Sequence, residues 1–130
     1  MRLLIADDHE IVRMGVRILL SDSEQWDVCG EARDGAEAIE KVMQLEPDVV
    51  VLDLSMPVMG GFDTARRIRH LSPSTRIVFF SIHETPTTAR LVGADAFVSK
   101  ASAAKDLAQT IRRVVDSTGS PRPVATPLPD

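Results

Sequence analysis

Short apolar runs recur along this chain, and they constrain its fold more than any other feature of the sequence. Four of them stand out, at residues 3–6, 28–32, 49–52 and 77–80, and a weaker fifth run covers residues 96–98. Short, nearly continuous apolar segments are typical of strands that are buried on both faces of a parallel sheet. The pattern therefore predicts a sheet whose strands are shielded from water on both sides.

Helical patterns fill the intervals between these runs. Apolar residues repeat on one helical face at residues 11–20, 38–43 and 107–115, and residues 61–71 are also predicted to be helical. Asp34 is placed to cap the second helix, because Glu37 follows it three residues later. Strands and helices thus alternate along the chain, which predicts an α/β sandwich with a parallel sheet and helices on both faces.

Composition narrows the class of protein. The chain has 130 residues, 44% of them apolar, which is enough for one domain with a sizeable core. The net charge is −4 with no basic cluster, so we do not expect this domain to bind nucleic acid directly. The single cysteine, Cys29, excludes an internal disulfide and is predicted to be a small core residue. No secretory signal or apolar segment of membrane-spanning length is visible, so we expect a cytoplasmic protein that makes no membrane contact.

Polar side chains follow four of the five apolar runs. Asp7 and Asp8 come after the first run, Asp53 after the third, Ser81 after the fourth and Lys100 after the fifth. The carboxyl ends of parallel strands meet at one edge of a sheet, where ligands of such folds bind. We therefore expect three carboxylates, a hydroxyl and an ammonium group to converge on one shallow cleft.

These groups together favour phosphoryl transfer. Clustered carboxylates repel one another by about 1 kcal/mol per pair at 4 Å in water, and a hard divalent cation such as Mg²⁺ relieves that repulsion. A free oxygen of Asp53 can then attack phosphorus, while the Lys100 ammonium stabilises charge on the transferring group. Ser81 is placed to donate a hydrogen bond to a phosphoryl oxygen. The predicted catalytic residues are therefore Asp53, Lys100 and Ser81.

Three segments resemble the receiver domains of bacterial response regulators. Residues 3–9, Leu-Leu-Ile-Ala-Asp-Asp-His, resemble the opening of such receivers, and residues 53–60, Asp-Leu-Ser-Met-Pro-Val-Met-Gly, resemble their phosphoacceptor motif. Residues 93–100, Gly-Ala-Asp-Ala-Phe-Val-Ser-Lys, resemble their last strand and its lysine. The resemblance extends from residue 2 to about residue 115. It implies a flavodoxin-like (βα)5 three-layer sandwich with strand order 2-1-3-4-5, and a phosphoacceptor switch rather than an enzyme that turns over substrate.

The resemblance also implies a role for each site residue. Asp53 accepts the phosphoryl group from a sensor histidine kinase. Mg²⁺ is bound directly by Asp8, by Asp53 and by the main-chain carbonyl of Ser55, while Asp7 contributes through water.

Ser81 and Phe97 match the hydroxyl and aromatic positions of the family's switch. Phosphorylation adds a charge of roughly −1.5 to −2. That charge is expected to draw Ser81 inward and let Phe97 repack, so that the surface formed by the fourth helix, fifth strand and fifth helix changes its partner preference.

The Asp-Asp-His opening and the Ser/Ala-rich start of the last helix resemble one branch of the family, whose receivers precede a LuxR-type helix-turn-helix domain. This implies transcriptional regulation, with a DNA-binding output domain beyond this chain and a homodimer as a further candidate assembly. We assign residues 1–117 to the receiver. Residues 118–130, which are rich in proline, are predicted to be a flexible tail or a truncated interdomain linker.

One segment departs from the family pattern. Between Ser81 and Lys100 the chain is about three residues shorter than expected, a little under one helical turn, and Pro86 lies inside it. A helix limited to about residues 87–92 is too short to be stable without packing. We expect a shortened or irregular fourth helix.

Alternative functions stay open at this point. The chain is also compatible with a phosphorylation-independent interaction module, and less so with a Mg²⁺-dependent phosphohydrolase, because Ser55 stands where such enzymes need a second acid. A flavin-binding module is disfavoured, since Asp7 and Asp8 would repel a phosphate.

The histidines His9 and His83 show no ligand spacing and are expected at the rim of the site or on the surface. Met56 and Met59 are expected to pack in the loop and are assigned no chemistry.

Overall fold

A computed structural model describes residues 1–21, 25–82, 93–101 and 104–116 of the chain. Its strands form one parallel sheet in the order β2-β1-β3-β4-β5. The strands are β1 (Arg2–Ala6), β2 (Asp27–Ala32), β3 (Val49–Leu52), β4 (Arg76–Ser81) and β5 (Ala96–Ser99). The predicted parallel sheet and its strand order are confirmed.

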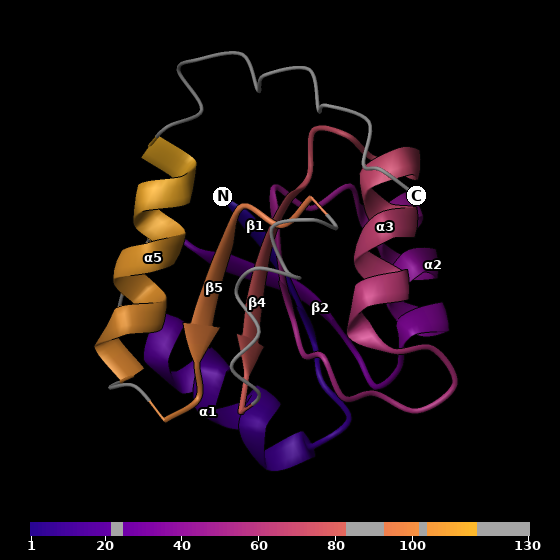
Figure 1. Ribbon diagram of the computed structural model, residues 1–130. Coiled ribbons are helices and arrows are strands. Elements are labelled where there is room, and N and C mark those ends of the chain that lie inside the picture. Colours follow the sequence, from indigo (N-terminus) through magenta and orange to yellow (C-terminus); the bar gives the residue numbers. More distant parts are fainter. Residues whose placement is uncertain (22–24, 83–92, 102–103, 117–130) are drawn as a thin grey trace.

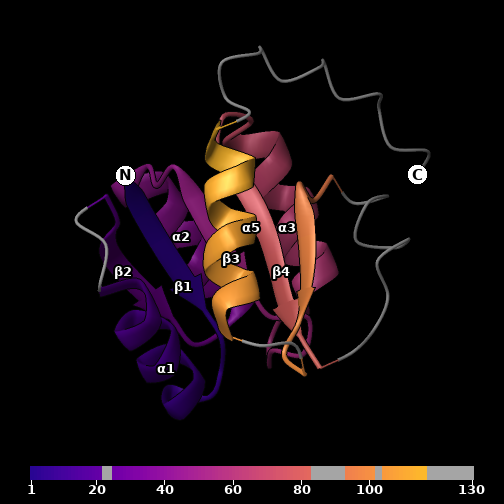
Figure 2. The same cartoon turned by 90° about the vertical axis from the view of Figure 1, so that its left-hand side faces the viewer.

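Four described helices cover this sheet. They are α1 (Glu10–Ser21), α2 (Gly35–Leu45), α3 (Gly61–Leu71) and α5 (Ala104–Asp116). Figure 1 shows α1 and α5 on one face of the sheet and α2 and α3 on the other, and Figure 2 shows the same layers from the side of α5. The predicted fourth helix and the proline-rich tail both lie outside the described residues. None of the described helices combines the length and apolar character that a membrane span requires.

Each face of the sheet has its own apolar core, because successive side chains of a strand point to opposite faces. In β1, Leu3 and Ile5 belong to the core under α1 and α5, whereas Leu4 and Ala6 belong to the core under α2 and α3. All four side chains are at most 1% exposed. The central strands are therefore buried on both sides, as the apolar runs predict.

Local signals at α2 behave as the sequence predicts. The Asp34 side chain accepts a hydrogen bond from the main-chain N–H of Glu37 at 2.8 Å, which caps the helix.

The expectation that Cys29 is a core residue needs correction. Cys29 is only half-buried and lies outside both cores, because β2 is an edge strand; its thiol is 3.3 Å from the carbonyl oxygen of Leu3.

A tight turn interrupts the loop between β3 and α3. The N–H of Met59 donates to the carbonyl oxygen of Pro57 at 2.7 Å, and the residue between them, Val58, has φ +70°. This is the geometry of a γ-turn whose central residue lies in the left-handed region, where a β-branched side chain is strained. The Val58 side chain is 84% exposed, so burial contributes little to offset that strain.

We expect Val58→Asn to stabilise the protein by about 1 kcal/mol, because asparagine tolerates a positive φ that valine does not. Urea denaturation measures the change. Val58→Ile, which keeps the branched Cβ, serves as the control and should leave the midpoint unchanged. A lower midpoint for Val58→Asn would contradict the strain assigned to this turn.

Candidate functional site

The candidate site lies at the carboxyl-terminal edge of the sheet. Strand pairing brings the ends of β1, β3 and β4 to one level: Ala6 pairs with Leu52, and Leu52 pairs with Phe79. The N–H of Asp53 donates to the carbonyl oxygen of Ala6 at 2.9 Å, which continues the ladder by one residue. The residues that follow these strands therefore meet at the edge where the arrowheads of Figure 1 point.

Lys100 joins the acids of this edge. Its Nζ is 2.7 Å from Oδ2 of Asp7 and 3.5 Å from Oδ1 of Asp53. Both acidic side chains are 3% exposed and the lysine side chain is 13% exposed, so water screens these charges only weakly. Lys100 is also held from its main chain, because its N–H donates to the carbonyl oxygen of Ser81 at 2.8 Å, and its ammonium lies 5.8 Å from the centre of the Phe80 ring.

The second acid of the opening pair lies closer to water. The Asp8 side chain is 30% exposed, and its Oδ1 is 3.0 Å from Nδ1 of His9. The same imidazole nitrogen is 3.2 Å from Oδ1 of Asp7, which also accepts the main-chain N–H of His9 at 2.9 Å. With a side chain that is 65% exposed, His9 is at the rim as expected, yet it contacts both acids. In the sequence, the only sign of these contacts is that His9 directly follows the two acids.

The buried position of Asp53 changes its acidity. Burial raises the pKa of its carboxyl group above the ordinary value, and the negative charge of Asp7 raises this pKa further. The charge of Lys100 and a main-chain hydrogen bond from Ser55 lower the pKa, while Asp8 adds a smaller upward effect. The net shift is upward, so ionised Asp53 is held at a cost that a further cation would relieve.

A glycine lets the chain turn back over Asp53. A Cβ atom built on Gly61 would lie 2.3 Å from the carbonyl oxygen of Asp53 and 2.6 Å from Cα of Leu54, so no side chain fits there. The N–H of Gly61 donates to the carbonyl oxygen of Leu54 at 2.9 Å. Helix α3 therefore starts directly against the two residues that follow β3 and fixes the path of the loop between them.

The donor atoms of this cluster fit a hard divalent cation. One ligand atom from each of Asp7, Asp8, His9 and Asp53 can be chosen so that all lie within 4.8 Å of one another. Three of the four residues offer carboxylate oxygens, the ligands that Mg²⁺ prefers. Both oxygens of Asp7 already accept hydrogen bonds, from His9 and Lys100, which leaves Asp8 and Asp53 better placed for direct contact with an ion.

The remaining predicted residues surround this cluster. Ser81 is fully buried at the end of β4 and pairs with Ser99, and it is tied to the cluster through the main chain of Lys100. Ser55 is exposed in the loop beyond Asp53. Phe97 is half-buried on β5 and packs against the core under α2 and α3, apart from the charged cluster. Met56 packs in that same core as expected, whereas His83 lies outside the described residues.

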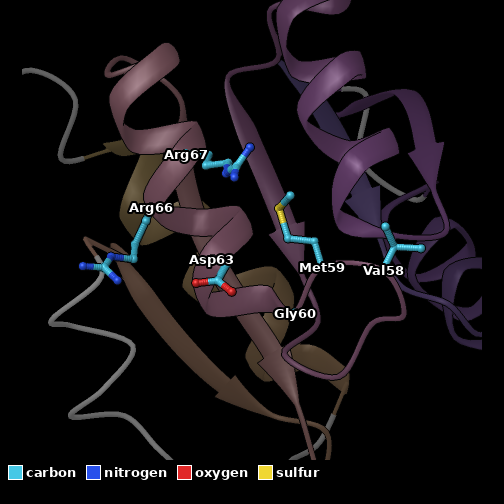
Figure 3. Close-up of a pocket in the computed structure, with 6 residues that line it drawn as sticks. All are labelled: Val58, Met59, Gly60, Asp63, Arg66 and Arg67. Atoms are coloured by element: carbon cyan, nitrogen blue, oxygen red, sulfur yellow. The ribbon is translucent and has the colours of Figure 1, made fainter.

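A separate cavity of about 540 Å³ lies beside the β3–α3 loop, lined by Val58, Met59, Gly60, Asp63, Arg66 and Arg67. Figure 3 shows its two arginine side chains pointing in different directions, as neighbouring positions on a helix do. The two guanidinium groups and the Asp63 carboxylate therefore do not converge on a common point. These six residues give no reason to place the chemistry here rather than at Asp53.

Comparison with known proteins agrees with this geometry. The model of the response regulator receiver domain matches residues 3–112. This chain belongs to that family. It is 39% identical over 114 residues to the nitrate/nitrite response regulator protein NarL of Escherichia coli, covering 85% of this chain and 53% of NarL. It is 34% identical over 116 residues to response regulator GacA of Pseudomonas viridiflava, covering 87% of this chain and 54% of GacA.

Solved structures show the same fold. A two-component response regulator of the LuxR family from Aurantimonas sp. SI85-9A1 matches with a TM-score of 0.85 and 34% identity, over 89% of this chain and 85% of that chain. The isolated REC domain of RcsB from Salmonella enterica, determined with the phosphomimetic BeF3⁻, matches with a TM-score of 0.83 and 29% identity, over 89% and 88% of the two chains. This chain spans about half the length of the curated relatives it matches.

The raised pKa of Asp53 makes stability depend on pH. Folding favours protonated Asp53, so this group lowers the free energy of unfolding as the pH rises from its ordinary pKa of 3.8 to the raised value. At neutral pH and without metal, Asp53→Asn removes the buried charge. We expect it to stabilise the protein by about 1 kcal/mol or more, because it removes the cost of burying the charge and the repulsion from Asp7, which at 4 Å is about 1 kcal/mol even in water.

Urea denaturation in a metal-chelating buffer measures this difference. It should narrow as the pH approaches about 4, near the ordinary pKa of an aspartate. Asp27→Asn, at the exposed start of β2, is the matched control and should change the midpoint little. A less stable Asp53→Asn protein at neutral pH would show that the charge of Asp53 is fully compensated.

Proposed function

We propose that this receiver accepts a phosphoryl group on Asp53 from a sensor histidine kinase, in a Mg²⁺-dependent reaction. The observation that carries the proposal is the cluster at the sheet edge: a buried Asp53 carboxylate, 3.5 Å from the Lys100 ammonium, with Asp7 and Asp8 beside it. A carboxylate with a raised pKa, a fixed cation and neighbouring oxygen ligands suits an aspartyl-phosphate site. Membership of the family supports the same reaction.

The acids of this site are proposed to hold Mg²⁺. Asp8 and Asp53 would bind it directly, Asp7 through water, and the main-chain carbonyl of Ser55 would complete the protein ligands. The exposure of Asp8 and the two occupied oxygens of Asp7 support this division of roles. When bound, the ion neutralises charge on the phosphoryl oxygens.

The chain's own residues then account for the transfer. A carboxylate oxygen of Asp53 attacks phosphorus as the bond from phosphorus to the donor's imidazole nitrogen breaks, and the electron pair of that bond leaves with the imidazole. The Lys100 ammonium, already 3.5 Å from Asp53, is placed to pair with a phosphoryl oxygen. The hydroxyl of Ser81 donates to another phosphoryl oxygen. The chain thus promotes its own phosphorylation, and it is not proposed to turn over a substrate.

The consequence of phosphorylation is a switch of partners. Ser81 and Phe97 lie on neighbouring strands, β4 and β5, so a movement of the serine toward the phosphate can be passed to the aromatic ring. The LuxR-type relatives support a DNA-binding output domain and a role in transcription. Residues 1–117 are proposed as the receiver and residues 118–130 as tail or linker.

Phosphorylation can be tested with acetyl phosphate and Mg²⁺, read out by intact mass. We expect the wild-type protein to gain one phosphoryl group, and to gain none without Mg²⁺. Asp53→Asn should gain none, and Lys100→Ala should react at least about 100-fold more slowly, a loss typical of removing one stabilising group. Asp63→Asn, an acid of α3 outside the cluster, serves as the control and should react normally.

A folded wild-type protein that gains no phosphate would refute the proposal and favour the phosphorylation-independent interaction module. Sustained release of inorganic phosphate from small phosphate esters would instead favour the phosphohydrolase.

The switch can be tested with beryllofluoride and protein whose phenylalanine residues are isotopically labelled. We expect the ring resonances of Phe97 to shift when beryllofluoride and Mg²⁺ are added to the wild-type protein, and to shift far less in Ser81→Ala. Ser99→Ala, which changes the residue paired with Ser81 on β5, is the matched control. Equal shifts in Ser81→Ala and wild type would exclude Ser81 as the trigger.

A further inference from the structure

A buried arginine lies directly behind the acidic pair. Arg13, on the first turn of α1 beyond His9, is only 8% exposed. Its Nη1 donates to the main-chain carbonyl oxygen of Asp7 at 2.6 Å, and its Nε donates to Oε1 of Glu31 at 3.0 Å. A guanidinium group is seldom buried without a reason, because losing its hydration costs free energy that its partners must offset.

The contact with Asp7 has a geometric consequence for Asp8. The peptide unit that joins these two residues is planar, so fixing the carbonyl oxygen of Asp7 also fixes the direction of the N–H and Cα of Asp8. The other side of Asp7 is fixed as well, since its N–H donates to the carbonyl oxygen of Ala32 at 3.0 Å. The N–H and the carbonyl oxygen of Asp7 are therefore both held. The contact with Arg13 thus sets the position of the Asp8 Cα, from which the Asp8 side chain extends.

Glu31 keeps the arginine in this position. It lies on β2, and its side chain is 25% exposed. Its carboxylate accepts a hydrogen bond from Nε of Arg13 and also contacts Arg17, one turn further along α1. The planar fork of a guanidinium lets Arg13 serve Asp7 and Glu31 at once, which a lysine with a single ammonium group reproduces poorly. The side chain therefore links the β1–α1 loop to the edge strand of the sheet.

We propose that Arg13 is a positioning residue for the metal-binding acids: by holding the carbonyl oxygen of Asp7, it aims Asp8 at the ion. This inference rests on the proposed function, because it assigns a role to Arg13 in Mg²⁺ binding at that same site. Residues that orient metal ligands in this way typically change metal affinity by about 10- to 100-fold when they are replaced.

The test is a titration of ¹⁵N-labelled protein with MgCl₂, followed through the amide resonances of Asp8 and Asp53. We expect Arg13→Met to raise the Kd for Mg²⁺ by about 10- to 100-fold. Arg13→Lys, which keeps the charge but only one donor group, should give an intermediate value. Arg17→Met is the matched control: it removes the other arginine at Glu31 and leaves the contact with Asp7, so its Kd should stay near that of the wild type.

Thermal unfolding without Mg²⁺ separates positioning from a purely structural role, which would lower Tm and leave the Kd unchanged. If Arg13→Met does not fold, Arg13→Lys decides alone, and a wild-type Kd in that variant overturns the inference. A wild-type protein that shows no shift with MgCl₂ refutes the proposed function itself. Normal Mg²⁺ binding by both the wild-type protein and the Arg13 variants refutes only the role of Arg13.

Discussion

The ammonium group of Lys100 is the interaction on which the arrangement of this site depends. It lies 2.7 Å from Asp7 and 3.5 Å from Asp53, although 93 residues separate Lys100 from Asp7 in the chain. Two carboxylates that are each 3% exposed would repel one another strongly without a cation between them. One lysine from the end of β5 thus makes it possible for the acids at the ends of β1 and β3 to lie together. Because burial and the charge of Asp7 still raise the pKa of Asp53, this compensation is incomplete.

The two acidic loops are held by different means. The β1–α1 loop is fixed by hydrogen bonds, because the main chain of Asp7 lies between Ala32 and the guanidinium of Arg13. The β3–α3 loop is fixed by close contact, since Gly61 brings the first turn of α3 against the carbonyl group of Asp53. The acids are therefore oriented by main-chain contacts, and their carboxylate groups stay available for chemistry at the edge of the sheet.

Much of this could be predicted from the sequence, because two simple regularities determine it. Short apolar runs indicate strands buried on both faces, and the polar residues that follow such strands must meet at one edge. Arg13 could not be found in this way: its partner Glu31 lies on another strand, and a charged residue on an amphipathic helix gives no sign of being buried. The positive φ of Val58 was also beyond prediction, since a β-branched residue is the opposite of the usual signal for a left-handed turn.

The strand order also affects how the domain forms during synthesis on the ribosome. β1 is made first, yet it lies between β2 and β3, so it gains its second neighbour only after residue 52 has been made. Lys100 follows later still, beyond β5. The acids at the strand ends are thus present in the nascent chain well before the cation that stabilises them. Parallel sheets depend on such distant contacts, which form slowly. Docking of β5 therefore both completes the sheet and brings in the cation that partly offsets the acids, so that an unfinished domain carries its acids uncompensated.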